Sequence, residues 1–220
     1  MMRNREAFDA NDDGFSEITQ LQSKTIGSKA FYRPSKSSKI NVDLSYINEK
    51  RRGGDRLSLE PHLTDITERL EHNTLFYNLT FDQFLDKKGN HKIGSYISGQ
   101  ITERDSYYGG LGGGRNTEDS LLALRAYGKT SDFSLVGGLQ YNYRLASGSM
   151  LSLGSEYQQN SVNDRIPGYQ RVIDQSDYSM GMFGQFEWLI SSRLKLLNGL
   201  RLDHIAIDSR NQLQGIERNQ

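Results

Sequence analysis

The sequence predicts an all-β fold, an antiparallel up-and-down transmembrane β-barrel of which the chain holds only a part. Two patterns and the composition predict it. Apolar and polar side chains alternate with a period of two along extended stretches, and short turns alternate with long polar connections. The composition has 22 Gly and 12 Tyr against 3 Pro and no Cys. It suits strands and turns, and it leaves no disulfide or thiolate metal site.

Charge and hydropathy narrow the class of protein. The formal net charge is +0, so no overall field attracts nucleic acid, and we expect no nucleic-acid partner. No stretch approaches the roughly 18 consecutive apolar residues of a transmembrane helix. Mean hydropathy is -0.69, but a barrel strand still suits a membrane, because only one of its faces needs to be apolar.

The alternation defines the strands. In residues 133–145 every second side chain from Phe133 to Leu145 is apolar or Gly, and most of those between, such as Gln140, are small or polar. The same pattern recurs in segments 40–46, 74–82, 93–101, 151–158, 178–188 and 194–203. A weaker strand covers Leu21 to Tyr32. We therefore expect about eight strands, with apolar side chains toward lipid and polar ones toward a hydrated interior.

The connections between these strands alternate in length. The short ones are Tyr32–Lys39, Leu85–His91, Ala146–Ser149 and Ile190–Arg193. The long polar ones are Arg51–Thr67, Tyr108–Gly128 and Gln159–Ser176. Short periplasmic turns and long extracellular loops are typical of outer-membrane barrels. Aromatic side chains stand beside the short turns, where a periplasmic girdle is expected: Phe84, Tyr143 and Trp188.

Two other folds stay open. A soluble all-β binding protein also alternates, although its strands are usually only about five or six residues long. A complete eight-stranded outer-membrane barrel fits the strand count. The charged segment Met1 to Asn11 is unlike a signal peptide, and the last residues are polar. We therefore expect both ends to be cut, with residues 1–20 an outside loop and strand lead-in, 21–207 the barrel strands and 208–220 a truncated outside loop.

An acidic loop near the N-terminus is a candidate calcium site. Asp9, Asn11 and Asp13 fall at the first, third and fifth positions of an EF-hand-like loop, with a glycine at the sixth. A Gln stands at the twelfth position, where a bidentate Glu is expected. Two interpretations stay open: a calcium loop with Asp9, Asn11 and Asp13 as ligands, or a hydrated Asx-rich turn.

Two other segments are candidates for ligand contact. Tyr107 and Tyr108 precede a Gly-rich stretch that lacks the Lys-Ser/Thr of a phosphate cradle. This stretch is either a flexible outside loop or a ligand-contacting loop in which both tyrosines supply flat, amphipathic surface. Arg51 and Arg52 begin a small basic turn, which either meets an anionic ligand or lipopolysaccharide or is an exposed charged loop.

Nothing in the sequence indicates catalysis. The 4 His are scattered without ligand spacing, and there is neither a Gly-x-Ser-x-Gly elbow nor a Cys nucleophile, so we predict that the chain is not an enzyme. Charged residues on the polar faces of the strands are predicted to form ion pairs across the hydrated interior. They are Asp43, Asp82, Glu156, Glu187, Lys195, Arg201 and Asp203.

Several stretches resemble TonB-dependent receptors of the Bacteroidetes type. They are Asp13-Gly14-Phe15, Lys50-Arg51-Arg52-Gly53-Gly54-Asp55, Glu103-Arg104-Asp105-Ser106-Tyr107-Tyr108-Gly109, Val136-Gly137-Gly138-Leu139-Gln140-Tyr141, Phe183-Gly184-Gln185-Phe186-Glu187-Trp188 and Gly199-Leu200-Arg201-Leu202-Asp203. The resemblance covers nearly the whole chain. The stretches are specific for this family when they are taken together. Within the family the spacing is closest to vitamin B12 (cobalamin) receptors, whose Asp-rich loop binds calcium that orders the ligand-binding loops. The resemblance places this calcium loop on Asn11, Asp12 and Asp13, with Asp9 nearby.

The resemblance implies a function as well as a fold. Such receptors are barrels of roughly 22 strands closed by an N-terminal plug, and they sit in the bacterial outer membrane among lipid and lipopolysaccharide. They take up large, scarce nutrients such as corrinoids or iron chelates, including siderophores. Energy reaches them through TonB, which contacts the plug. We expect no plug in this chain, and therefore no transport by this chain alone.

Overall fold

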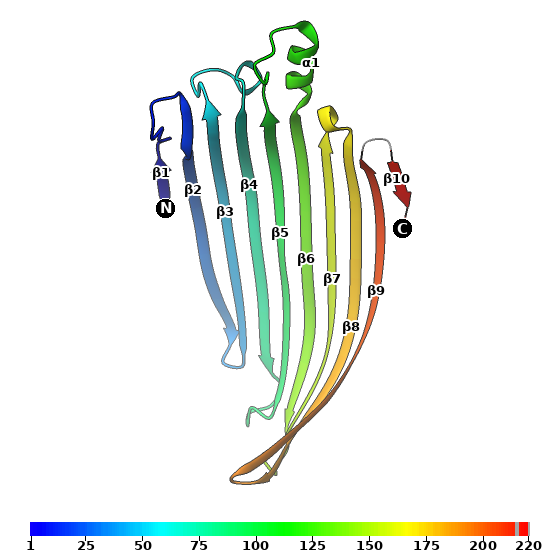
Figure 1. The fold of residues 1–220 in the computed structure, drawn as a ribbon. Coiled ribbons are helices and arrows are strands. Elements are labelled where there is room, and N and C mark those ends of the chain that lie inside the picture. The colour runs from blue at the N-terminus through cyan, green and yellow to red at the C-terminus, as the bar shows by residue number, and fades with distance from the viewer. Residues whose placement is uncertain (214–215, 220) are drawn as a thin grey trace.

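The computed structural model describes residues 1–213 and 216–219. They form one antiparallel sheet in which ten strands follow the order of the sequence (Figure 1). Eight strands are long: β2 (Phe15–Ser35), β3 (Ser38–Asp55), β4 (Thr67–Phe84), β5 (His91–Gly109), β6 (Tyr127–Arg144), β7 (Met150–Ile166), β8 (Arg171–Ser191) and β9 (Leu194–Leu213). The short strands β1 (Met2–Arg5) and β10 (Ile216–Asn219) flank them.

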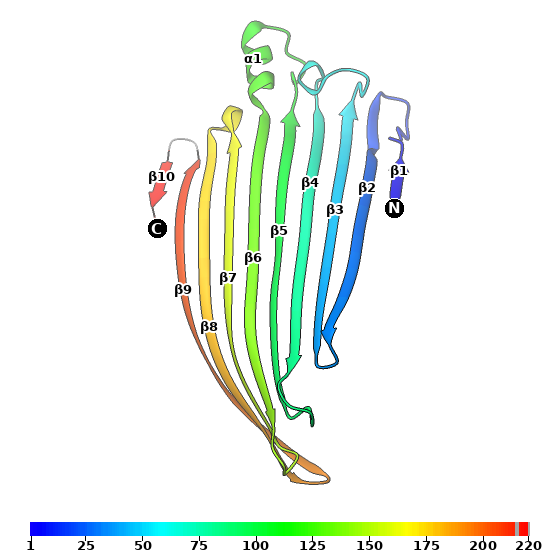
Figure 2. The ribbon, with the colours of Figure 1, turned by 180° about the vertical axis from the view of Figure 1, so that it is seen from behind.

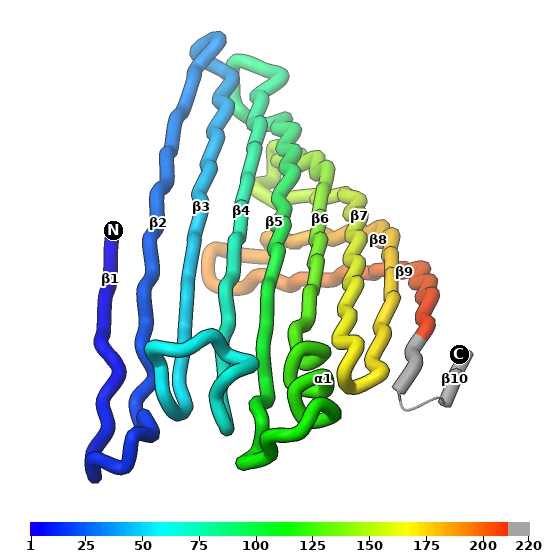
Figure 3. Tube along the Cα trace, turned by 90° about the horizontal axis from the view of Figure 1, so that it is seen from above, coloured from blue at the N-terminus to red at the C-terminus, as the bar shows by residue number. Residues whose placement is uncertain are grey.

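The sheet is curved and open. Figure 2 shows it from behind, and Figure 3, from above, shows the strands side by side along one bent surface. Among the described residues, β1 pairs only with β2 and β10 only with β9, so the two edges do not meet. The predicted all-β fold, an antiparallel barrel in part, is confirmed. The eight long strands match the predicted number.

The strand register places the predicted apolar side chains on one face. Leu75 lies opposite Ile101, and Ile101 lies opposite Phe133. Residues that lie opposite one another share a face, as do residues two apart along a strand. Exposed members of this band of large apolar side chains include Ile26, Leu139, Met182, Leu200 and Leu202. An apolar band left uncovered on a sheet is what a lipid-facing barrel wall presents.

The opposite face is polar and carries the predicted ion pairs. Lys29 contacts Asp43 at 3.2 Å, and Lys195 contacts Glu187 at 2.7 Å. The other predicted members are also paired: Lys92 with Asp82 at 2.7 Å, and Arg201 with Glu156 at 3.3 Å and with Asp203 at 2.8 Å. Pairing in exposed positions adds little stability, but it neutralises charge along the wall that faces the interior.

The long-loop end of the sheet holds the three helices. They are η1 (Pro61–Leu63), α1 (Thr117–Arg125) and η2 (Pro167–Tyr169). None of the helices in the described residues is long and apolar enough to cross a membrane. The buried apolar side chains of the described residues also lie at this end rather than along the sheet: Tyr107, Ala123, Ala126 and Ile166.

Two of the predicted long connections are more ordered than expected. The segment Tyr108–Gly128 contains α1, which the sequence interpretation missed. The segment Gln159–Ser176 is mostly strand: β7 continues to Ile166, η2 makes the turn, and β8 begins at Arg171. The prediction of a long loop there was wrong. Outside the lipid both faces of a strand are wet, so the apolar alternation that marks the strand disappears although the hydrogen-bond ladder continues.

Candidate functional site

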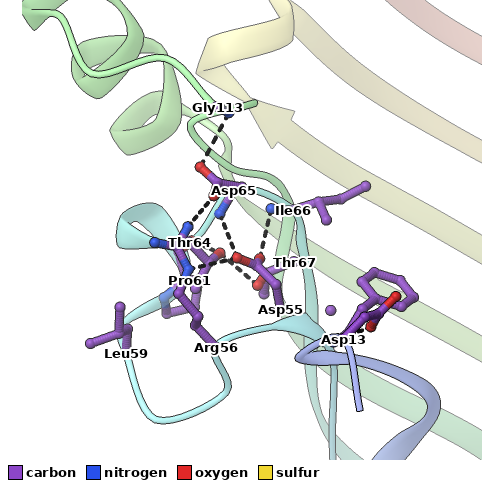
Figure 4. Close-up of polar contacts among 12 residues, drawn as sticks. Asp13, Asp55, Arg56, Leu59, Pro61, Thr64, Asp65, Ile66, Thr67 and Gly113 are labelled. Carbon is purple, nitrogen blue, oxygen red and sulfur yellow. Dashed lines mark hydrogen bonds and ion pairs between the residues drawn. The ribbon is translucent and has the colours of Figure 1, made fainter. Parts of the chain in front are cut away.

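A carboxylate at the end of β3 organises the β3–β4 connection. Asp55 accepts hydrogen bonds from the backbone N–H groups of Asp65 (3.1 Å) and Ile66 (2.8 Å), as Figure 4 shows. The Nε of Arg56 donates to the same carboxylate at 2.7 Å. Because both oxygens of Asp55 are engaged, the connection is folded back onto the strand that it leaves.

Asp65 then joins this connection to the next one, between β5 and β6. Its carboxylate accepts from the N–H of Gly113 at 3.1 Å (Figure 4). It also accepts from Nη1 of Arg115 at 2.7 Å and is ion-paired with Arg56. The hydrogen bond from Arg115 is the main cause that lowers the pKa of Asp65 below its usual 3.8. At neutral pH the carboxylate is ionised and can hold both arginines.

Backbone hydrogen bonds also join the β3–β4 and β5–β6 connections. The N–H groups of Leu111 and Gly112 donate to the carbonyls of Thr64 (2.8 Å) and Asp65 (2.9 Å). Gly110 has φ +150, and a Cβ there would overlap the carbonyl of Asp65. Glycine at this position therefore permits the two connections to approach. The Gly-rich stretch lies where the two connections touch. The close approach explains the glycine at position 110, so no phosphate-binding role is required for it.

Helix α1 follows the Gly-rich stretch, and its N-terminus has a capping signal in the sequence. Asn116 is the N-cap: its side chain accepts from the N–H of Asp119 at 2.8 Å, and the Asp119 side chain accepts from the N–H of Asn116 at 3.3 Å. This reciprocal pair is a capping box. Ala123 is the buried residue of the helix, whereas Leu121, Leu122 and Leu124 are exposed.

Tyr107 is the centre of the packed end, which we call the cap. It is 0% exposed, and its ring lies 4.6 Å from that of Tyr127 at an angle of 58°. The Tyr127 hydroxyl is 3.1 Å from Nδ1 of His62 in η1. Tyr169 of η2 donates its hydroxyl hydrogen to the Tyr108 carbonyl. Three connections thus meet at one aromatic cluster, and the cap is a packed unit.

The four predicted ligand contacts do not share one surface. Alternation places Arg51 and Tyr108 on the polar, inner face, and Arg52 and Tyr107 on the outer face. Arg52 and Arg51 lie within β3 rather than in a turn. Tyr107 is buried and supports the cap, whereas Tyr108 is 42% exposed. Arg51 donates from Nε to Glu49 at 2.7 Å. Ligand contact stays a prediction, and its geometry favours the inner pair.

The structure brings part of the predicted calcium loop together and adds a residue. Ligand oxygens of Asp9, Asp13 and Glu17 lie within 4.8 Å of one another. Glu17 was missed, although it stands at the ninth position of the loop counted from Asp9, a position that supplies a ligand in EF-hands. Asp12, with φ 58, is outside this cluster. Asn11 is engaged within the loop, where its amide donates to Asp13 at 3.2 Å.

The same oxygens also order the loop itself. Asp9 accepts from the N–H of Gly14 at 2.7 Å and from that of Asn11 at 3.2 Å. Asp13 accepts from the N–H of Phe15 at 2.8 Å. Desolvation raises the pKa of Asp9, but the backbone donors outweigh it and leave this pKa below 3.8. The loop is therefore held by Asx-type hydrogen bonds of its own, and calcium binding stays a prediction.

A comparison with protein families agrees with the all-β fold. The family described as "TonB dependent receptor-like, beta-barrel" matches residues 9–219. No curated protein matches the chain. The match spans nearly every described strand, from the acidic loop before β2 to the end of β10. The open antiparallel sheet and its apolar face agree with this match. The chain belongs to the TonB-dependent receptor-like β-barrel family.

Proposed function

We propose that this chain receives a large, scarce nutrient, a corrinoid or an iron chelate, at the extracellular end of an outer-membrane receptor. The family accounts for the coarser part of this statement: its members are barrels of bacterial outer-membrane receptors and transporters, not enzymes. The nutrient and the residues that contact it are the proposal. TonB would act through a plug domain, to which the inner face of the barrel is turned.

The observation that carries the proposal is the packed cap. A ligand-binding surface gains affinity when its parts are held in place before the ligand arrives. Here Asp65 ties two connections together, and Tyr107 is fully buried against Tyr127 in the cap. Below the cap, the inner face presents Arg51 on β3 and Tyr108 on β5, with one strand between them. A cation and an exposed aromatic ring suit a large ligand with both polar and flat parts.

We expect the purified chain in detergent to bind at least one member of a panel of cyanocobalamin and ferric siderophores. Replacing both inner residues, Arg51→Ala with Tyr108→Ala, should weaken that binding by about tenfold or more, since each contact contributes on the order of 1 kcal/mol. The measurement is isothermal titration calorimetry. The matched control is Lys50→Ala, the neighbour of Arg51 on the outer face, where binding should be unchanged.

Equal losses in the double variant and in Lys50→Ala would show that the inner face is not the contact surface. Binding of no panel member by a chain that inserts into lipid would remove the corrinoid and iron-chelate proposal. It would leave the family assignment in place, because that assignment does not depend on the ligand.

We also propose that the acidic loop before β2 binds a calcium ion that stiffens it. The convergence of Asp9, Asp13 and Glu17 supports this second proposal. The loop is exposed, and extracellular calcium modules bind with dissociation constants of about 0.1–1 mM, so we expect a value in that range. Calcium titration followed by calorimetry, with magnesium for comparison, measures it.

The loop offers a matched control for the calcium titration. Asp13→Asn with Glu17→Gln removes two charges from the cluster and should abolish the binding heat. Asp12→Asn removes a charge from the same loop but from outside the cluster, and it should leave the dissociation constant within about twofold of the parent value. Absence of a calcium-dependent heat in the parent chain would show that the loop is an Asx turn only.

A further inference from the structure

A pocket with an aromatic wall lies at the long-loop end of the sheet. Its volume is about 550 Å³, which is within the range of small-molecule sites. The large apolar and aromatic side chains of its lining are all partly exposed: Phe15, Ile66, Tyr108 and Tyr169. The charged side chains of the lining are two carboxylates, Glu17 and Glu68, and no described Lys, Arg or His joins them. The pocket therefore combines aromatic surface with negative charge.

The strand register fixes the side of the barrel to which this pocket opens. Glu68 of β4 lies in one row between Gly53 of β3 and Tyr108 of β5, and residues that lie opposite one another share a face. Tyr108 is seven positions beyond Ile101, whose row belongs to the outer apolar band. An odd separation puts the two side chains on opposite faces, so Glu68 and Tyr108 face the barrel interior.

The charge of Glu68 is not neutralised within the part of the chain that the structure describes. The glycine beside it in the row offers no side chain, and no described cation lies within ion-pair distance of its carboxylate. Two arginines of the same face contact other acids: Arg51 lies 2.7 Å from Glu49, and Arg104 lies 3.8 Å from Asp164. The carboxylate of Glu68 is therefore available to a ligand.

The second carboxylate of the pocket has other contacts. Glu17 accepts a hydrogen bond from the N–H of Ala10 at 2.8 Å and belongs to the acidic cluster with Asp9 and Asp13. A cation bound in that cluster would neutralise Glu17 but would leave Glu68 charged. The charge that a ligand meets in this pocket is therefore assigned to Glu68 and does not depend on calcium.

A carboxylate beside exposed aromatic rings favours an organic cation. An ammonium group donates charge-assisted hydrogen bonds to the carboxylate, and the face of a neighbouring ring attracts the same charge. Tyr169 donates its hydroxyl hydrogen to the Tyr108 carbonyl, which holds a second ring at the pocket. A bare calcium ion would need six or more oxygen ligands, and an anion would be repelled by Glu68.

We infer that this pocket binds an alkylammonium group, with the cation at Glu68 and its carbon chain against Tyr108 and Tyr169. The inference rests on the proposed function for the kind of ligand, and it adds that the nutrient carries a positive charge where it meets this part of the inner face. Recognition of the charge would then select among metal complexes of similar size.

The experiment compares two small probes that differ in charge. Phenethylammonium has an aromatic ring and a protonated amine, whereas phenethyl alcohol has the same ring with a neutral hydroxyl group. Isothermal titration calorimetry of the purified chain in a non-ionic detergent, with a chelator present to remove divalent cations, measures both affinities. We expect the ammonium to bind about tenfold more tightly than the alcohol, because only the ammonium gains the ion pair and the cation–π contact.

Glu68→Gln should remove this preference, because it keeps the size of the side chain and deletes its charge. The affinity for phenethylammonium should fall by about tenfold, and that for the alcohol should not change. The matched control is Glu103→Gln on β5. Glu103 is exposed and lies two positions from Ile101, so it is on the outer face, and its replacement should leave both affinities unchanged.

Two results would overturn the inference. One is equal affinity of the two probes for the parent chain. The other is an equal loss of phenethylammonium binding in Glu68→Gln and Glu103→Gln, which would show a general effect of negative charge instead of a contact in the pocket.

The nutrient panel separates this inference from the proposed function. A chain that binds cyanocobalamin or a ferric siderophore but shows no preference between the two probes contradicts the inference alone. A chain that prefers phenethylammonium through Glu68 but binds no member of the panel contradicts the corincoid and iron-chelate proposal, and it leaves the ammonium site in place.

Discussion

Replacing Leu139 by Arg is expected to lower the free energy of unfolding in lipid by about 2–4 kcal/mol, the range for a charged residue near the bilayer midplane. Leu139 is 53% exposed and stands in the middle of the lipid-facing row of β6, between Phe133 and Tyr141. The arginine would have to be buried in hydrocarbon without a partner. Urea unfolding of the chain in phospholipid vesicles measures the change.

Gln140→Arg is the matched control, because it puts the same side chain one residue along the same strand but on the inner face. Gln140 is exposed there and donates to Asn142 at 2.9 Å. We expect a change within about 0.5 kcal/mol, as for ordinary surface substitutions. Equal destabilisation by the two variants would show that the faces are assigned incorrectly. A cooperative unfolding transition of the parent chain in water without lipid would show that the band needs no membrane.

Replacing Tyr107 by Ala is expected to destabilise the cap by about 3–5 kcal/mol, the usual range for deleting a buried aromatic side chain. Tyr107 is 0% exposed and packs against Tyr127, so its removal leaves a cavity beneath three connections. The strands below should keep their ladder. Hydrogen exchange should therefore show lost protection in α1 and little change in the lower halves of β5 and β6.

Two variants test this assignment. Tyr108→Ala removes the neighbouring ring, which is 42% exposed, and keeps the backbone carbonyl that accepts from Tyr169. We expect less than about 1 kcal/mol from it. Tyr107→Phe removes a buried hydroxyl that has no hydrogen-bond partner among the described residues, so it should be neutral or slightly stabilising. A large effect of Tyr108→Ala on α1 would show that the exposed ring supports the cap.

Local patterns in the sequence determined the strands and the chemistry of their faces. Along the strands that contain Leu139 and Leu153, apolar residues alternate with polar or small ones. The face on which each side chain lies depends only on its position along the strand. For the same reason the pairing of Arg201 and Lys195 with inner-face carboxylates was predictable. Neighbouring residues of a strand lie on opposite faces, so Arg51 and Arg52 face opposite ways, as do Tyr107 and Tyr108. The sequence interpretation did not use this consequence.

Only the tertiary structure decided how the long-loop end is built. Asn116 and Asp119 carried a capping signal for α1, but beyond the lipid no alternation distinguishes strand from loop, so Gln159–Ser176 was misassigned. Tyr107 packs on Tyr127, whose hydroxyl meets His62 across 65 positions. Asp65 meets Arg115 across 50 positions. Such contacts depend on how three connections are brought together in space, and no periodicity within one segment encodes that arrangement.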